Sequence, residues 1–218
     1  MFYRPDANDH GLPFNPFKAC VVPRPIGWIS TVDATGRVNL APFSQANMVG
    51  SDPPYVMFSA GGADDGVRLK DSVTNAKATG AFVFNMATHD LRDAVNLSGQ
   101  IVDPAVDELA AAGLTAAPSR IVAPPRVADS PVNLECVLHD TLALPGNTWA
   151  GTFTIVIGRV VGVHIRDDAF TADGRLDVAR LRPLARLGYM DYTAVERVFE
   201  MGALDPADAE KWRKAMGG

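Results

Sequence analysis

Two long segments rich in β-branched residues constrain the fold of this chain most strongly. They span residues 132–144 and 151–165, and only a short stretch containing Pro145 and Gly146 separates them. The strands of a small parallel α/β unit are shorter, and a long crossover separates them. The two segments therefore predict long antiparallel strands of the kind that build a barrel wall.

Shorter segments extend this pattern through the rest of the chain. Further strands are predicted over residues 18–22, 26–32, 37–41, 55–59 and 81–86. Helices are predicted from an N-cap at Asp65 to near Gly80, over 89–97, from Asp103 to Gly113, and after the Asp205-Pro206 pair. This order predicts a mainly β fold, a predominantly antiparallel domain with peripheral α-helices.

The length of the chain fits a single domain. With 218 residues, 47% of them hydrophobic, the chain can close a substantial core. Residues 1–17, rich in Pro, Asn and Asp, are expected to form an irregular N-terminal arm. Residues 18–190 are expected to form the domain itself, and residues 191–218 a helical C-terminal extension packed on it.

The charge balance makes nucleic acid a poor candidate partner. Lys plus Arg number 20 against 25 Asp plus Glu, which gives a net charge of -5 and a pI near 5.3, so no broad basic face is available for a polyanion. The first residues lack the basic head and apolar run of a secretory signal. The most apolar stretch, 153–165, is interrupted by Arg159 and is too short for a membrane helix. We therefore expect a cytoplasmic protein without membrane contact.

The residue types that bind metals or act as nucleophiles are scattered. Cys20 and Cys136 each lie in an apolar segment without a CxxC, so both are expected to be buried free thiols. The four histidines stand singly, which favours a structural role for each. The motifs GxGxxG, GxxxxGK[ST] and GxSxG are absent. We therefore predict no metal site, Rossmann nucleotide site, P-loop or serine-nucleophile elbow.

Two segments in the first quarter of the chain offer polar groups for a ligand. On the predicted strand 26–32, alternation places Trp28, Ser30 and Val32 on one face, which suits a barrel wall with a ligand outside it. The following segment, 41–47, is rich in small and polar side chains. It either offers hydrogen-bonding groups to a heteroaromatic ring or is an edge strand that leaves the sheet.

A third segment combines groups that can hold a phosphate. Arg68, Lys70 and Ser72 supply cations and a hydroxyl within one short stretch. Lys70 and Ser72 also suit a solvated helix face without any ligand, and spacing alone favours that interpretation.

A series of motifs in a fixed order resembles the flavin-reductase-like family of FMN-binding split barrels. The motifs are Arg24-Pro25-Ile26 with Ser30-Thr31, Asn39 to Ser44, Asp52-Pro53-Pro54, Lys70-Asp71-Ser72 with Asn75, Gly80 to Asn85, Ser130 to Cys136, Ile157 to Val161 with His164, and Arg186 to Tyr189. The resemblance covers about residues 18–190. Ser72 replaces the usual Thr but keeps the hydroxyl, whereas Arg159 stands where a Glu is common.

This resemblance implies an antiparallel split β-barrel with Greek-key character that forms a homodimer and binds FMN at the subunit interface. Lys70 and Ser72, with Arg68 or Arg24, would hold the FMN phosphate. The isoalloxazine would lie against Ser44, Gln45 and Asn47. The full set of cofactor-binding residues that it implies is Arg24, Trp28, Ser30, Thr31, Ser44, Gln45, Asn47, Ser59, Arg68, Lys70 and Ser72.

The activity implied is that of an FMN-dependent oxidoreductase, in the first place a flavin reductase that uses NADH or NADPH. No protein side chain is assigned a catalytic role, because the flavin carries the hydride chemistry. A monooxygenase or another electron-transfer protein is a candidate partner. Two alternatives stay open: an FMN protein that exchanges electrons with another partner or substrate, and a non-catalytic flavin- or haem-binding module. The choice between NADH and NADPH, the electron acceptor, and whether FMN exchanges also stay open.

Overall fold

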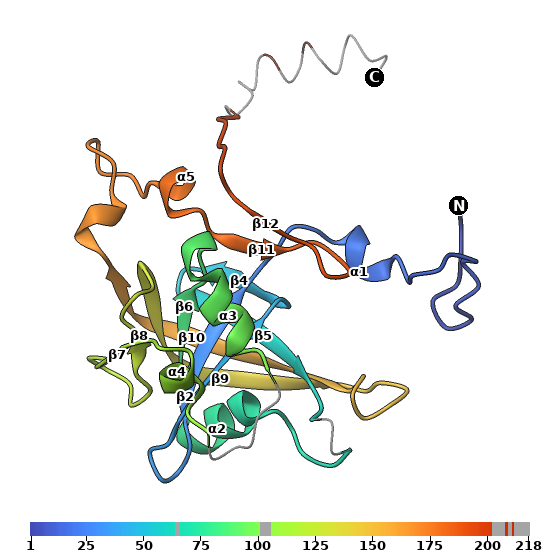
Figure 1. The fold of residues 1–218 in the computed structure, drawn as a ribbon, viewed down its shortest axis with the longest axis horizontal. Helices are drawn as coiled ribbons and strands as arrows, with labels where there is room; N and C mark the ends of the chain where they lie inside the picture. Colours follow the sequence, from blue (N-terminus) through green and yellow to red (C-terminus); the bar gives the residue numbers. More distant parts are fainter. Residues whose placement is uncertain (64–65, 101–105, 202–207, 209–210, 212–218) are drawn as a thin grey trace.

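A curved antiparallel sheet forms the centre of the computed structural model, which describes residues 1–63, 66–100, 106–201, 208 and 211 (Figure 1). In the described part, this sheet has seven strands in the spatial order β3-β2-β6-β9-β10-β5-β4, all paired antiparallel. The strands are β2 (Gly27–Val32), β3 (Val38–Phe43), β4 (Ala46–Ser51), β5 (Pro54–Gly61), β6 (Ala81–Met86), β9 (Val132–Leu144) and β10 (Phe153–Ile165). The fold is mainly β, as predicted.

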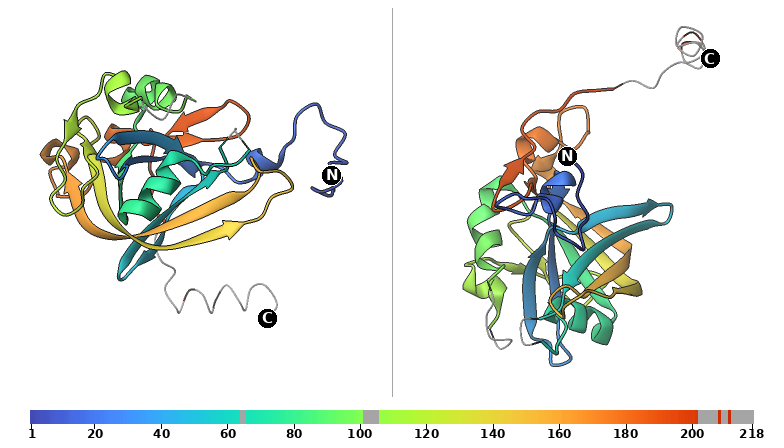
Figure 2. Two further views of the ribbon diagram at one scale, coloured as in Figure 1. Left: turned by 90° about the horizontal axis from the view of Figure 1, so that it is seen from below. Right: turned by 90° about the vertical axis from the view of Figure 1, so that its right-hand side faces the viewer.

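Short elements surround the sheet. One small sheet contains β1 (Arg24–Pro25), β11 (Leu184–Arg186) and β12 (Tyr192–Ala194). A second pairs β7 (Ala116–Ala117) with β8 (Arg126–Val127). The described helices are α1 (Phe17–Cys20), α2 (Asp71–Thr79), η1 (His89–Leu91), α3 (Arg92–Leu97), α4 (Glu108–Ala111), η2 (Asp167–Ala169) and α5 (Val178–Leu181). The N-terminal arm projects beyond the sheet on the side of the turn between β9 and β10 (Figure 2). None of the helices in the described residues is long and apolar enough to cross a membrane.

The two long strands pair along their whole length, which confirms the prediction for this part of the chain. β9 has the predicted bounds, and β10 begins at Phe153 instead of Gly151. Their pairing runs from Phe153 opposite Leu144 to Ile165 opposite Val132. Two register shifts interrupt it, which bends the pair.

The middle of β10 passes close to the aromatic ring of Phe82 on β6, a strand of the same sheet. A Cβ at Gly158 would lie 2.4 Å from the nearest carbon of the Phe82 ring. Phe82 is fully buried and its ring meets that of Phe58 edge to face. Glycine at position 158 therefore lets β10 cross the core without displacing this ring.

Two hydrophobic clusters lie on opposite faces of β2. One contains Ile29 together with Phe58 and with Val73 of α2, and the other contains Trp28 together with Val95 of α3. Because alternate residues of a strand point to opposite faces, both faces of β2 meet a core. All six residues of β2 are buried. The structure thus corrects the expectation that one face of this strand is directed outside the barrel.

Several predicted elements differ from the observed ones. The predicted strand 18–22 is wrong, because Phe17–Cys20 form one helical turn after Pro16. This places Cys20 at the surface, whereas Cys136 is buried as predicted. The helix predicted from Asp65 begins only at Asp71.

Some of these predictions fall outside the described residues. Asp65 itself, Asp103 and the helix predicted after Asp205-Pro206 are among them. The helix predicted to end at Gly113 is confirmed only for α4, where Asp107 caps the first turn by accepting a hydrogen bond from the Ala110 amide. The helix predicted over 89–97 is confirmed as η1 followed by α3.

A buried carboxylate on the large sheet forms hydrogen bonds with the loop between β7 and β8. The side chain of Glu135 in β9 is fully buried. It accepts hydrogen bonds from the amides of Arg120, Ile121 and Val122 at 2.7–3.0 Å and from His164 Nε2 at 2.5 Å. Burial alone would raise the pKa of Glu135, but these hydrogen bonds outweigh burial and lower its pKa to about 2.

We expect Glu135→Gln to lower the free energy of unfolding by about 2–4 kcal/mol, because its amide N–H₂ would face backbone donors that need an acceptor. Since the folded pKa lies below its usual value near 4.3, the carboxylate contributes its full stabilisation above about pH 5 and loses it as the pH falls towards about 2. Urea unfolding of the wild type and the variant between about pH 6 and pH 3 measures both effects.

The control for this prediction is Glu196→Gln, which removes an exposed carboxylate. Equal losses of stability in the two variants, or an unchanged acid dependence in Glu135→Gln, would contradict the role of Glu135.

Candidate functional site

A pocket of about 350 Å³ lies between α1, which follows the N-terminal arm, and the large sheet. Segments that are distant in the sequence build its wall: α1, β1, the connection from β3 to β4, the end of β5, the start of β10, and β11. Its lining residues are Lys18, Arg24, Pro42, Phe43, Ser44, Gln45, Ser59, Ala60, Gly61, Lys70, Phe153, Arg186 and Tyr189. We call it the cationic pocket.

Four cationic side chains line this pocket, and no Asp or Glu is among its described lining residues. The four are Lys18, Arg24, Lys70 and Arg186. In a chain with a net charge of -5, such a grouping creates a local positive potential in a concave site. The pocket therefore suits a ligand that carries negative charge.

The two arginines are engaged in holding the wall together. Arg24 donates to the carbonyl oxygens of Val21 and Leu187, both at 2.9 Å, and also to that of Lys18. Arg186 donates to Tyr192 Oη and to the carbonyl of Tyr189, and its guanidinium lies 4.4 Å from the centre of the Tyr192 ring. These contacts join β1, α1 and the segment after β11 around the pocket.

The two lysines, in contrast, keep their donors available. Within the part of the chain that the structure describes, no residue forms a hydrogen bond or ion pair with the ammonium group of Lys18 or Lys70. Lys70 occupies the N-cap position of α2, immediately before Asp71. The first amides of a helix lack partners inside the helix, and its N-terminus carries a partial positive charge. Lys70 and the start of α2 together can hold a phosphate.

Polar side chains of Ser44, Gln45 and Ser59 line the same pocket. Ser44 and Gln45 connect β3 to β4, and the Gln45 carbonyl accepts a hydrogen bond from the Ser59 amide at 2.7 Å. This bond fixes the connection against β5. The half-buried Ser44 and Gln45 side chains can donate and accept hydrogen bonds at the edge of a heteroaromatic ring.

Five of the residues implied by the sequence resemblance thus meet in one pocket, and six do not. The five are Arg24, Ser44, Gln45, Ser59 and Lys70. The six others, Trp28, Ser30, Thr31, Asn47, Arg68 and Ser72, do not line it.

Four of these six side chains lie in the interior. Trp28 is fully buried, and its Nε1 donates to Ser98 Oγ at 2.9 Å. Ser30, also fully buried, donates to the Pro125 carbonyl at 2.5 Å. Their hydrogen bonds explain the polar side chains on this strand without a ligand.

Thr31 and Ser72 take part in a second buried network. The side-chain amide of Asn39 donates to Thr31 Oγ1 at 3.2 Å and to Ser72 Oγ at 2.8 Å. Asn75 donates to Thr31 Oγ1 at 3.2 Å as well. The network ties α2 to β2 and β3, which fixes the position of Lys70 at the start of the helix.

The remaining two of the six are exposed. Asn47 accepts a hydrogen bond from the Met48 amide on β4. Arg68 lies before α2, and its carbonyl accepts a hydrogen bond from Trp149 Nε1 at 3.0 Å. The sequence interpretation put Arg68 and Lys70 inside the helix predicted after Asp65, whereas both precede α2.

Sequence reasoning missed Lys18, Arg186, Tyr189 and Phe153 as pocket residues. Arg186 and Tyr189 belong to a motif that was recognised, but the motif did not show where they point. Lys18 was placed in a strand that is in fact α1. The edge-to-face contact of Phe14 with Tyr189, at 6.0 Å between ring centres, also brings the N-terminal arm to the pocket.

Comparison with known proteins decides the family. A family model described as the flavin reductase like domain matches residues 19–191. The chain belongs to this family. An uncharacterized protein of Halalkalibacterium halodurans is 33% identical over 201 residues, which cover 92% of this chain and 95% of that protein.

Solved structures of the same fold agree with this assignment. Nitrilotriacetate monooxygenase component B from Bacillus cereus is 26% identical, with a TM-score of 0.83 over 92% of this chain and 98% of that one. A flavin reductase with a split barrel domain from Shewanella frigidimarina, 20% identical, has a TM-score of 0.78 over 94% and 100% of the two chains. Flavoredoxin of Desulfovibrio vulgaris, 21% identical, has a TM-score of 0.70 over 86% and 94%. The fold is the antiparallel split β-barrel of flavin reductases.

The interior position of Trp28 leads to a prediction that separates core from pocket. We expect Trp28→Phe to lower the free energy of unfolding by about 1–3 kcal/mol, because it removes buried ring volume and leaves Ser98 without the indole donor. Flavin affinity should stay within about twofold of the wild type, since the side chain does not line the cationic pocket. Denaturant unfolding and flavin titration measure the two quantities. A large loss of affinity in a folded variant would contradict the assignment.

Proposed function

We propose that this chain is an FMN-dependent oxidoreductase, a flavin reductase that transfers hydride from NADH or NADPH to FMN in the cationic pocket. The observation that carries the proposal is the position of Lys70 at the start of α2, in a pocket lined by four cations, where its ammonium has no partner among the described residues. Membership of the flavin reductase like family supports it. So does the likeness of the fold to an FMN-binding protein from Thermus thermophilus, with a TM-score of 0.69.

The residues of the pocket fit the parts of FMN. Lys70 and the first amides of α2 suit the phosphate, and Lys18 adds a second available cation. Ser44 and Gln45 suit the polar edge of the isoalloxazine, with Phe153 available for apolar contact. Hydrogen-bond donors fixed at that edge favour the negative charge that reduction places on the ring.

Bound FMN supplies the hydride-accepting chemistry, which moves two electrons and one proton from the nicotinamide. The protein residues orient the ring, compensate charge and limit access of water. The sequence carries no Rossmann motif, so we infer that the nicotinamide lies directly on the flavin. Tyr189, with Phe14 of the arm in contact with it, borders the space where that would occur.

We infer that the working form is a homodimer. β4 is an edge strand of the large sheet, and its Met48 and Val49 side chains are 65% and 53% exposed. An exposed apolar edge strand is a pairing surface that proteins cover. A second copy on this edge would cover it next to Gln45 and thereby close the pocket. A monooxygenase component is a further candidate partner, as the likeness to nitrilotriacetate monooxygenase component B suggests.

The first experiment measures reduction. The purified protein, saturated with FMN under anaerobic conditions, should lose its flavin absorbance when NADH or NADPH is added, and the faster nucleotide identifies the donor. Binding of FMN without bleaching by either nucleotide would contradict the reductase activity and favour the electron-transfer alternative. Absence of FMN binding would contradict the proposed site as well.

The second experiment tests the phosphate position with a matched pair of lysine variants. We expect the wild type to bind FMN more tightly than riboflavin, which lacks the phosphate, by about 10- to 100-fold, the equivalent of one charge-assisted hydrogen bond worth about 1.5–3 kcal/mol. Lys70→Gln should remove most of this difference and leave riboflavin affinity unchanged. Lys77→Gln, which changes an exposed lysine on the same helix, should keep the difference. Equal behaviour of the two variants in fluorescence titrations would contradict the position of the phosphate.

A further inference from the structure

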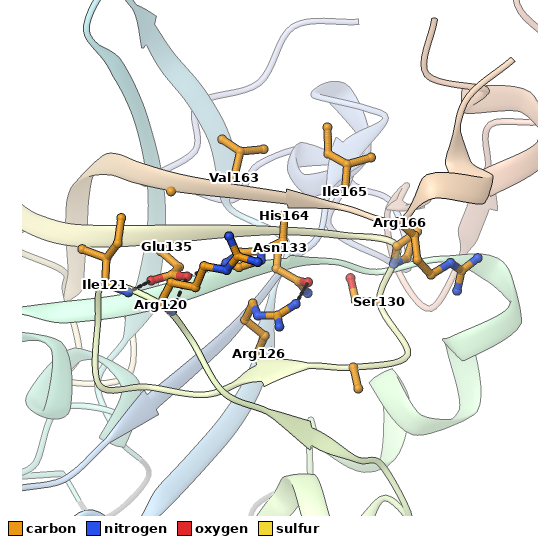
Figure 3. A pocket seen from close by; sticks show the side chains of 13 residues that line it. Arg120, Ile121, Arg126, Ser130, Asn133, Glu135, Val163, His164, Ile165 and Arg166 are labelled. Carbon is orange, nitrogen blue, oxygen red and sulfur yellow. Dashed lines mark hydrogen bonds and ion pairs between the residues drawn. The ribbon is translucent and has the colours of Figure 1, made fainter. Parts of the chain in front are cut away.

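We propose that a second pocket, at the opposite end of β10, binds a small organic molecule through a phosphate or carboxylate group. This pocket has a volume of about 500 Å³ and lies between the loop before β8 and the paired ends of β9 and β10. Arg120, Arg126, Arg166, Asn133, Glu135 and His164 line it (Figure 3). We call it the arginine pocket.

The arginine pocket is separate from the cationic pocket of the same chain. Phe153 at the start of β10 lines the cationic pocket, and His164 near its end lines the arginine pocket. At about 3.3 Å per residue, the length of strand between these two residues is roughly 36 Å. One FMN molecule cannot occupy both, so the arginine pocket needs a ligand of its own.

The side-chain oxygens of Glu135 and Asn133 in the arginine pocket are already occupied. A carboxylate has about four lone-pair positions, and Glu135 uses them for three backbone amides and His164 Nε2. Asn133 Oδ1 accepts from Arg126 Nη1 at 3.3 Å. A ligand that enters the pocket therefore finds few acceptors for its own donors.

Two arginines of the pocket, in contrast, keep hydrogen-bond donors available. Within the described residues, the Arg120 guanidinium forms no hydrogen bond or ion pair. Arg126 uses Nε for the Pro118 carbonyl at 3.2 Å and Nη1 for Asn133, which leaves Nη2. Arg166 is paired with the exposed carboxylate of Asp168 at 2.7 Å, so Arg120 and Arg126 carry the proposal.

The lowered pKa of Glu135 does not cancel this positive character. Its charge is compensated by donors that the loop supplies, and those hydrogen bonds fix the backbone from which the Arg120 side chain extends. The loop thus sets Arg120 on the same side of β9 as Arg126 (Figure 3). Two guanidinium groups with spare N–H donors and compensated neighbouring acceptors match a phosphate or carboxylate group.

The space in the pocket exceeds that of a bare ion, and the exposed side chain of Ile121 lines one part of it. An acid group held by the arginines therefore leaves room for the molecule that carries it. Phenyl phosphate and benzoate represent the two sources of the acid group, and inorganic phosphate tests the group without a body.

Ligand-observed NMR on the full chain in the presence of saturating FMN tests this proposal. We expect phenyl phosphate or benzoate to bind the wild type, and Arg120→Gln and Arg126→Gln each to weaken that binding by about tenfold or more. Arg120→Gln removes no observed hydrogen bond, so the fold should be kept, and thermal unfolding checks this. Arg159→Gln is the matched control, because it removes an exposed arginine of β10 that does not line the pocket.

The outcomes separate the alternatives. Binding of phenyl phosphate but not benzoate, or the reverse, supports the proposal and identifies the acid group. No binding of any of the three probes to the wild type would overturn it. Equal binding in Arg120→Gln, Arg126→Gln and Arg159→Gln, or binding that perturbs the flavin spectrum, would also overturn it by placing the probes elsewhere.

Discussion

The pairing of β9 with β10 is the constraint on which the rest of the structure depends. The two strands carry β6 on one side and β5 on the other, and so join the two halves of the sheet. Phe153 at one end of the pair belongs to the cationic pocket, and Glu135 with His164 at the other belongs to the arginine pocket. Gly158 lies in the middle of β10, and because it has no side chain, β10 can pass the buried ring of Phe82 without a clash. The same hydrogen-bonded ribbon therefore forms the core and positions both candidate sites.

Buried hydrogen bonds connect this framework to the proposed flavin site. Thr31, Ser72 and Asn75 belong to the family motifs, and here they join α2 to β2 and β3. Because α2 is held in this way, Lys70 at its start lines the same pocket as Ser44 and Gln45 of the connection between β3 and β4. The motif residues thus divide into those that line the cationic pocket and those that hold its wall in place, a distinction that a ligand-binding motif alone does not express.

The sequence predicted most of the fold because long β-branched segments and turn residues act locally. It predicted β6, β9 and most of β10, and the family motifs identified Ser44, Gln45 and Lys70, which do meet in one pocket. The errors arose where tertiary packing decides. Alternation on β2 suggested an outward face, but a second core covers that face, and a single turn of helix replaced the strand expected at Lys18. The convergence of Arg24, Lys18 and Arg186 also depends on distant segments coming together, which residue spacing does not show.

The central claim is that FMN lies in the cationic pocket with its phosphate at the start of α2. The most direct measurement is a crystal structure of the protein grown with FMN. The account predicts electron density for the phosphate within hydrogen-bonding distance of Lys70 Nζ, with the isoalloxazine against Ser44 and Gln45. Flavin density in another place, for example at Arg126 in the arginine pocket, or a phosphate without contact to Lys70, would contradict it.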